Sequence, residues 1–346
     1  MELRAGSFKG AALLKLKNFL SDCGGLKYDD RVEYTVYLTE ILPSGEEKIA
    51  AAGSLDGTVL KCIAVSPEYR SEGLAATIIS ELVNEASRRK RHHLFLFSKP
   101  ENSELFCDLG FYPIAKTGQI LLMENKKHGI EQFVASLKDK SSKPGGETGI
   151  SGAIVANCNP FTKGHLYLVE TAAKHCDLLY LFIVSENKSA FDAETRLDLV
   201  RKGTAHLPNV RVFPTGPYLV SSATFPDYFL KDLPDEVSPE TLNTELDLTI
   251  FAECFARPLG ITRRYVGTEP FDPVTSVYNK QMKELLPKYG IELFEIERLK
   301  DSSSAVSASR VRHMLQEGNL DAVKELVPPV TYEYLKNIGG KQNGKS

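Results

Sequence analysis

A short stretch near the middle of the chain combines a hydroxyl, a glycine and an imidazole at a spacing that suits phosphate binding. Thr162, Gly164 and His165 follow the apolar run 150–156 and open a segment with helical spacing. The free N–H groups and the dipole of a helix start favour an anion. Gly164 lets the backbone approach a phosphate, and Thr162 and His165 can donate to its oxygens. The stretch predicts a phosphate site, and the alternative is that His165 only caps the helix.

A second polar stretch near the carboxyl end could contribute to the same site. Ser307, Ser309 and Arg312 lie where a loop enters a predicted helix. The serines can cap that helix while neighbouring N–H groups face an anion, and Arg312 can reach a phosphate with its forked donors. The simpler alternative is an ordinary serine cap beside a solvated arginine.

The elements around these residues alternate between strands and helices. Apolar strands are predicted at 150–156 and 178–184, and helices from about Gly164 and over 193–204. Further strands are predicted at 210–213, 264–266 and 291–296. This alternation favours a Rossmann-like, doubly wound parallel sheet, whose first strand-to-helix turn binds phosphates.

The first part of the chain also predicts an α/β domain. A helix with Leu74, Ile78, Leu82 and Ala86 on one face follows three predicted strands and precedes another. A short helix at 103–109 ends at Gly110, where a glycine is a common stop. The strands are predicted at 31–41, 48–55, 59–65, 93–97, 112–115 and 119–123.

One segment divides the two parts. Residues 138–149 are charged, rich in Ser, Gly and Pro, and lack apolar periodicity, so they predict a linker. The expected domains are therefore 1–137 and 150–338, and residues 339–346 are expected to form a flexible tail.

The composition excludes several classes of protein. The 346 residues carry a formal net charge of −3, so neither nucleic acid nor an anionic membrane is an expected partner. The apolar runs are strand-length, too short to span a bilayer. The six cysteines form no CxxC pair, so no metal site or disulfide framework is indicated, and a cytoplasmic enzyme is expected.

The central stretch resembles the HxGH/TxGH signature of the nucleotidyltransferase superfamily, and the stretch 306–312 resembles its second signature, ISxSxxR. The resemblance implies that Lys188, in the loop after the strand 178–184, binds the reacting phosphate group. It also implies a nucleotide contact at Gly267 and Glu269. The other residues expected to bind ATP are Asn159, Pro160, Phe161, Thr162, Gly164, His165, Ser307, Ser309 and Arg312.

Chemistry of this type needs mainly positioning and positive charge. An acceptor attacks the α-phosphate of ATP and pyrophosphate leaves, so negative charge builds on the phosphoryl oxygens. His165, Lys188 and Arg312 are the expected catalytic residues. Mg²⁺ is expected on the substrate phosphates and water, without a metal site on the protein.

The first domain resembles the GNAT acetyltransferases. Arg70, Gly73 and Ala75 match the Q/RxxGxG/A loop, which binds the pyrophosphate of a coenzyme A-like molecule. Many members have a tyrosine where this chain has Phe106, and phenylalanine cannot protonate a departing thiolate. The departure favours binding of a CoA-like arm over ordinary acetyl transfer.

The pairing of these two domains, with both signatures, resembles the citrate lyase ligase family over nearly the whole chain. The resemblance implies that ATP and acetate give acetyl-adenylate and pyrophosphate. The acetyl group then passes to the thiol of a dephospho-CoA-type prosthetic group on the citrate lyase acyl carrier (gamma) subunit, and AMP leaves.

Two alternatives remain open. The second domain could join ATP to a phosphorylated acceptor, as pantetheine-phosphate and nicotinamide-mononucleotide adenylyltransferases do. Alternatively, the chain could be a non-catalytic module that binds CoA and nucleotide. Pyrophosphate release with acetate, compared with release with the phosphorylated acceptors, discriminates between these functions.

Overall fold

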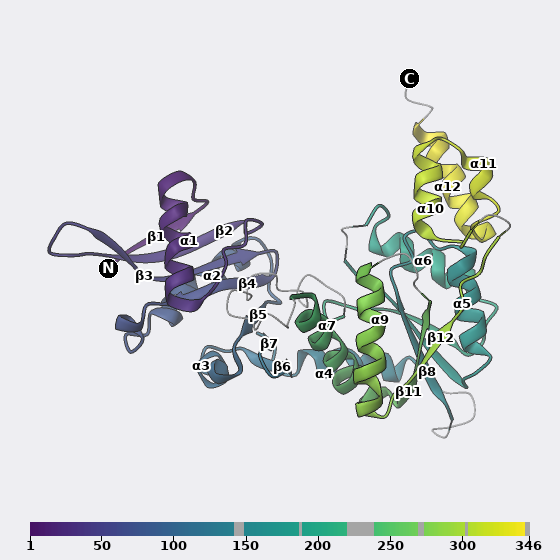
Figure 1. The fold of residues 1–346 in the computed structure, drawn as a ribbon, viewed down its shortest axis with the longest axis horizontal. Helices are drawn as coiled ribbons and strands as arrows, with labels where there is room; N and C mark the ends of the chain where they lie inside the picture. Colours follow the sequence, from purple (N-terminus) through teal and green to yellow (C-terminus); the bar gives the residue numbers. More distant parts are fainter. Residues whose placement is uncertain (142–148, 187–188, 220–238, 269–272, 302–303, 343–346) are drawn as a thin grey trace. The chain divides into compact units, whose positions relative to one another are not determined.

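The structure is a computed structural model of residues 1–346. It describes all of them except 142–148, 187–188, 220–238, 269–272, 302–303 and 343–346. The chain forms two compact units (Figure 1). The first comprises Met1–Ile130 and Ser222–Thr249, and the second comprises Glu131–Ser221 and Ile250–Ser346.

The first unit is built on a seven-stranded mixed sheet in the order β1-β2-β3-β4-β5-β7-β6. The predicted strands and both predicted helices are present, and β1 and α1 are additional. In chain order the unit contains β1 (Glu2–Gly6), α1 (Gly10–Gly24), β2 (Tyr34–Ile41), β3 (Glu47–Asp56), β4 (Val59–Val65), η1 (Pro67–Tyr69), α2 (Leu74–Arg88), β5 (Phe95–Ser98), η2 (Pro100–Asn102), α3 (Ser103–Asp108), β6 (Tyr112–Lys116), β7 (Leu121–Glu124) and, later, α7 (Pro239–Thr249).

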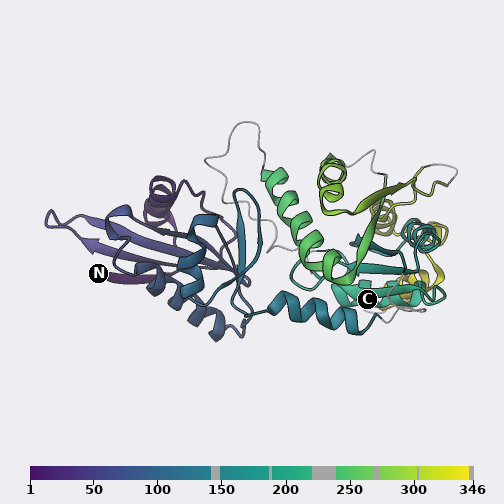
Figure 2. The ribbon, with the colours of Figure 1, turned by 90° about the horizontal axis from the view of Figure 1, so that it is seen from below.

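Two helices cover the faces of this sheet. Helices α1 and α2 lie on opposite sides of it (Figure 2). The apolar stripe of α2 that the periodicity predicts is buried against β2, β3 and β4. Gly53 on β3 permits this contact, because a Cβ there would lie 2.5 Å from Ile78 Cγ2.

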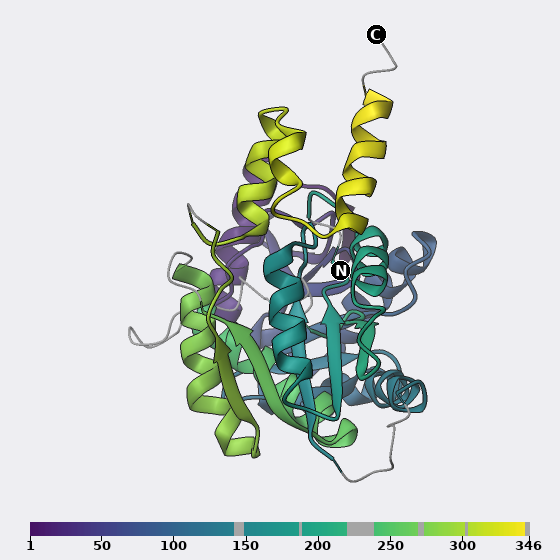
Figure 3. The same ribbon diagram turned by 90° about the vertical axis from the view of Figure 1, so that its right-hand side faces the viewer.

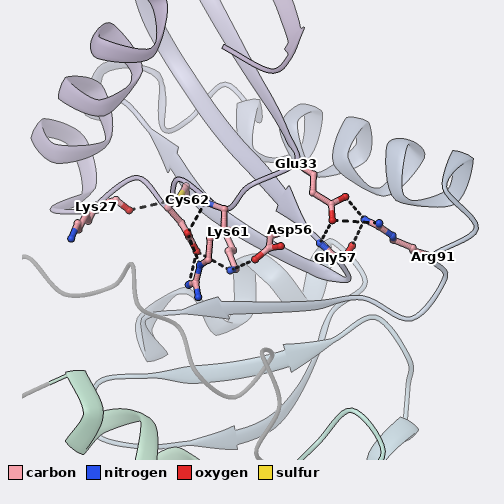
Figure 4. Close-up of polar contacts among 9 residues, drawn as sticks. Lys27, Glu33, Asp56, Gly57, Lys61, Cys62 and Arg91 are labelled. Atoms are coloured by element: carbon pink, nitrogen blue, oxygen red, sulfur yellow. Dashed lines mark hydrogen bonds and ion pairs between the residues drawn. The ribbon is translucent and has the colours of Figure 1, made fainter. Parts of the chain in front are cut away.

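An ionic cluster lies beneath the loop that precedes β2 (Figure 4). Lys61 on β4 is only 2% exposed, and its Nζ donates to Asp29 at 2.9 Å and to Asp56 at 2.5 Å. Desolvation raises the pKa of Asp29, but hydrogen bonds from Arg31 and Lys61 outweigh it and hold the pKa well below its usual range. The buried ammonium is therefore compensated, and the cluster ties the loop to β4.

The second unit contains a five-stranded, fully parallel sheet in the order β10-β9-β8-β11-β12 (Figure 3). This order confirms the Rossmann-like expectation. Its elements are α4 (Gly129–Asp139), β8 (Ser151–Ala156), α5 (Lys163–Ala173), β9 (Leu178–Ile183), α6 (Ala193–Gly203), β10 (Val210–Pro214), the π-helix η3 (Ile250–Ala256), α8 (Arg257–Leu259), β11 (Ile261–Gly267), α9 (Pro273–Leu285), η4 (Leu286–Tyr289), β12 (Glu292–Ile296), α10 (Ala308–Gln316), α11 (Leu320–Val323) and α12 (Pro329–Gln342).

Both faces of β9, which pairs with β8 and β10, are buried, as its unbroken apolar run predicts. Leu179, Leu181 and Ile183 pack in a cluster with apolar residues of α5 and α6. Phe182, which alternates with them, makes an edge-to-face contact with Phe255 of η3. Helices therefore cover both sides of the sheet, and α10, α11 and α12 gather at one end of the unit (Figures 1 and 3).

The predicted domain limits differ from the compact units in detail, and as functional boundaries they stay predictions. The expected linker begins inside α4. Ser141, a further residue of it, belongs to the second unit, and its hydroxyl lies 3.0 Å from Tyr180 Oη. Residues 142–148 of that linker lie outside the described part. Helix α12 continues to Gln342, through the first residues of the tail expected from 339.

Among the described residues, no helix has the length and apolar character needed to cross a membrane.

Candidate functional site: a nucleotide pocket at the switch point

A large cavity of the second unit lies where the strand order reverses. From β8 the chain moves to β9 and β10 on one side, and then to β11 and β12 on the other. Ligands of such sheets bind at this point, outside the carboxyl ends of the strands. A cavity of about 790 Å³ opens there between the ends of β8, β11 and β12 and the starts of α5 and α10. The predicted site residues that line it are Thr162, Gly164, His165, Gly267, Ser307 and Ser309.

Thr162 and His165 form a reciprocal cap at the start of α5. The Thr162 hydroxyl accepts from the His165 backbone N–H at 3.3 Å, and His165 Nδ1 accepts from the Thr162 N–H at 3.1 Å. Because Nδ1 accepts from a backbone amide, it carries no proton, so the ring proton lies on Nε2. The cap therefore fixes the tautomer as well as the orientation of the ring.

The environment of His165 keeps the imidazole neutral. Desolvation, and secondly the positive charge of Arg298, lower the pKa of His165 to about 4 from its ordinary value of 6.5. The ring stacks on the buried Phe161, with the ring centroids 6.2 Å apart and 13° between the planes. At neutral pH, His165 thus offers the cavity an Nε2–H donor and no charge.

Gly164 brings the two predicted signatures into contact. A Cβ at this position would lie 2.4 Å from the backbone oxygen of Val306. The glycine is thus required by the close approach of the loop that carries the second signature. In that loop Ser307 caps α10, its hydroxyl accepting from the Arg310 N–H at 3.2 Å. The starts of α5 and α10 therefore meet at one cavity.

Four of the predicted residues are not among the described residues that line the cavity. Arg312 donates from Nη1 to Asn159 O at 2.6 Å and from Nη2 to Ser309 Oγ at 3.1 Å. Asn159 Oδ1 accepts from the Phe191 N–H at 3.1 Å. Pro160 and Phe161 are buried. These residues hold the loop, and their contact with nucleotide stays a prediction.

Two predicted residues, Lys188 and Glu269, lie outside the described residues. The cavity also contains cations that motif matching does not single out. Arg298 lines it, with Nε donating to Thr268 O at 2.7 Å. Arg310 lines it too, but pairs with Asp301 at 2.6 Å. Arg298 follows β12, and only its place at the end of a parallel strand could have indicated it.

A second cavity, of about 500 Å³, lies in the first unit and is lined by Arg70, Gly73 and Ala75, the three residues predicted for a CoA-like arm. Gly73 has φ +70° and precedes α2, so a left-handed backbone conformation opens the helix there. Phe106 lines the same cavity and has no proton to donate. The predicted loop thus borders a cavity, as a binding role requires.

The second cavity forms because two parallel strands separate. β4 and β5 pair only at Val59↔Phe95 and Leu60↔Leu96. Beyond these pairs β4 continues to Val65 and β5 to Ser98, and the residues of both continuations line the cavity. The opening is therefore a slot between strand edges.

The described residues contain no group of three or more His, Cys, Asp or Glu side chains that could hold a metal ion. The cysteines are free thiols, and burial raises the pKa of Cys62 and of Cys158 to about 12. Such thiols are protonated and unreactive at neutral pH.

Solved structures resemble each part of the chain at low identity. The ribosomal-protein-S18-alanine N-acetyltransferase from Escherichia coli is 19% identical, with a TM-score of 0.30, over 36% of this chain and 92% of its own. TmcAL from Thermotoga maritima, bound with alpha-thio ATP, is 14% identical, with a TM-score of 0.36, over 56% of each chain.

Sequence comparisons are more specific. The model of the citrate lyase ligase C-terminal domain matches residues 151–335. The citrate (pro-3S)-lyase ligase of Escherichia coli K12 is 42% identical over 335 residues, which cover 94% of this chain and 91% of that protein. The same ligase of Klebsiella pneumoniae is 40% identical over 88% of each chain. With a family model that matches more than half of the chain and relatives of this length and identity, the chain belongs to the citrate lyase ligase family.

Proposed function

We propose that the chain activates acetate with ATP and passes the acetyl group to the prosthetic thiol of the citrate lyase acyl carrier (gamma) subunit. In the first step a carboxylate oxygen of acetate attacks the α-phosphorus of ATP. The bond to the β-phosphate oxygen breaks, which gives acetyl-adenylate and pyrophosphate. In the second step the thiolate attacks the acetyl carbonyl, the thioester forms and AMP leaves.

One observation carries this proposal: the two signatures border a single cavity at the switch point. The starts of α5 and α10 border this cavity with the positive ends of their dipoles, and Thr162, Ser307 and Ser309 line it with hydroxyls. Negative charge on a triphosphate is stabilised by such donors. A carboxylate acceptor needs no activating base, because acetate is ionised at neutral pH.

His165 acts as a hydrogen-bond donor in this account. Its neutral ring presents Nε2–H while Nδ1 is held by the Thr162 amide. A donor that is already oriented stabilises charge that develops on a phosphoryl oxygen without reorganisation during the reaction. Arg298, which lines the same cavity, adds positive charge on the β12 side.

Mg²⁺ fits this site as a companion of ATP. The described wall offers hydroxyls and amides and contains no cluster of carboxylates that would form a cage. Mg²⁺ usually keeps several waters and is bound largely through substrate phosphates. Bound in this way, it would neutralise charge on the β- and γ-phosphates.

The cytoplasmic location inferred from the composition stays a prediction.

The slot in the first unit is the proposed site for the prosthetic arm. The arm carries amide groups, which can pair with strand edges as an added strand does. Arg70, which lines the slot, suits the pyrophosphate of the arm. Phe106 in place of a proton donor supports binding without catalysis by this unit.

We expect Arg70→Ala to weaken binding of dephospho-CoA, used as a mimic of the arm, about tenfold, because one charged contact with the pyrophosphate is lost. Calorimetry with the purified chain measures the affinity. Arg88→Ala is the matched control, since Arg88 is an exposed arginine of the same unit that pairs with Glu81 and Glu85. Equal affinities of the Arg70 variant and the native chain would refute the arm site.

Exchange of radiolabelled pyrophosphate into ATP tests the proposed reaction. We expect exchange that depends on acetate. Exchange supported instead by phosphopantetheine or nicotinamide mononucleotide would identify a nucleotidyltransferase. ATP and dephospho-CoA binding without exchange under any of these conditions would identify a binding module.

A further inference from the structure

Arg196, on α6, is an interior residue with an unusual set of partners. Its side chain is 0% exposed, and it is among the largest fully buried side chains of the described residues. Nε donates to Phe191 O at 3.0 Å, and Nη2 donates to Glu186 O at 2.6 Å. Nη1 donates to both Asn157 O at 2.8 Å and Asn157 Oδ1 at 2.6 Å.

These four acceptors are carbonyl oxygens, and none is a carboxylate. Desolvation lowers the pKa of Arg196, as expected for a buried cation. The group still stays protonated, because the ordinary pKa of arginine lies above 12. Burying an arginine in this way is unfavourable unless its donors are fully used. The four bonds therefore depend on the planar, forked guanidinium group, whose geometry a lysine ammonium group could not reproduce.

The acceptors belong to two loops at the carboxyl edge of the sheet. Asn157 follows β8 and lines the nucleotide cavity, whereas Glu186 and Phe191 belong to the loop that follows β9. Further bonds join the same loops. Asn157 Nδ2 donates to Ser189 Oγ at 3.1 Å, and the Phe191 N–H donates to Asn159 Oδ1 at 3.1 Å. The buried Arg196 side chain thus bonds to the residues that follow β8 and to those that follow β9.

We infer that Arg196 is a positioning residue for the adenylation site. Its guanidinium fixes the backbone and the amide side chain of Asn157. It also holds Glu186 and Phe191, which follow β9, against the strand end that leads into the Thr162–His165 corner. Arg196 acts through Asn157 and makes no contact with substrate. The expected loss of activity rests on the proposed function, whereas the expected effect on the backbone around Asn157 does not.

The test compares Arg196→Lys with Arg211→Lys in the intact chain. The lysine at 196 keeps the charge but loses the fork, so only part of the carbonyl set can be held. We expect the acetate-dependent ATP–pyrophosphate exchange to fall about tenfold in kcat/KM for ATP. We also expect faster amide hydrogen exchange around Asn157 and Phe191. Arg211 also donates to backbone carbonyls, but at the start of β10, and its variant should behave as the native chain.

Two outcomes would overturn the inference, and a third would overturn only the proposed function. Native exchange activity combined with native amide protection in Arg196→Lys would show that the fork is dispensable. Loss of protection over the whole second unit, or failure to fold, would show a general core role. If the native chain shows no acetate-dependent exchange, the proposed function fails, whereas the local amide protection still decides the role of Arg196.

Discussion

His165→Asn should abolish most adenylate formation while leaving the fold intact. The asparagine Oδ1 can accept from the Thr162 N–H as Nδ1 does, so the cap on α5 is kept. The donor that Nε2 presents to the cavity is lost. Removing one preorganised donor to a developing oxyanion lowers the rate about 10²–10³-fold. Acetate-dependent ATP–pyrophosphate exchange measures the loss, and circular dichroism checks the fold.

His165→Gln is the matched control, because its longer amide can place an N–H group near the position of Nε2. We expect it to retain more activity than the asparagine variant. A native exchange rate in His165→Asn would exclude the imidazole from the reaction.

His165→Asn should also make the free energy of unfolding depend less on pH between about 4 and 6.5. Chemical denaturation at several pH values measures this dependence. With a folded pKa of about 4 against 6.5 unfolded, His165 lowers stability as pH falls through this window, and asparagine does not titrate.

Gly164→Ala should separate the two signatures. The new Cβ would lie 2.4 Å from Val306 O, and this neighbour is backbone, so the loop before α10 must move. Displacement of catalytic groups by about 1 Å can lower the rate about 10²-fold. Overpacking should also reduce the free energy of unfolding by about 1–3 kcal/mol. Pyrophosphate exchange and chemical denaturation measure the two effects.

Gly118→Ala provides the comparison for this variant. A Cβ at Gly118 meets no atom within 4 Å, and the residue lies in the first unit. It should change neither exchange nor stability by a measurable amount. If Gly164→Ala were equally silent, the contact between Gly164 and Val306 would not hold the cavity together.

Local patterns predict most of the fold because apolar runs and helical stripes dominate it. β4 is found at the predicted residues, and β9 differs from its prediction by one residue at its end. The pattern does not predict α1, whose N-cap position is Lys9 without a side-chain cap, or the edge strand β1, whose five residues include little apolar surface. The π-helix η3 is not predicted either, because a run of mostly apolar residues shows no helical periodicity of polar and apolar positions.

The motifs predict where the candidate site lies but not how its residues divide the work. Thr162, Gly164 and His165 occupy the predicted corner. The reason for the glycine, contact with Val306, joins residues far apart in the chain and could not be inferred from spacing. The role of Arg196 could not be inferred from the sequence for the same reason, since it depends on carbonyl groups that only the fold brings together.

Isotope transfer from acetate tests the central claim most directly. The chain is incubated with ATP, the thiol acceptor and acetate labelled with ¹⁸O in both carboxylate oxygens, and the AMP is analysed by mass spectrometry. If acetate attacks the α-phosphorus at this pocket, each AMP carries one labelled oxygen, because the thiol later displaces AMP from the acetyl carbon. AMP without label, formed together with the thioester, would contradict the account.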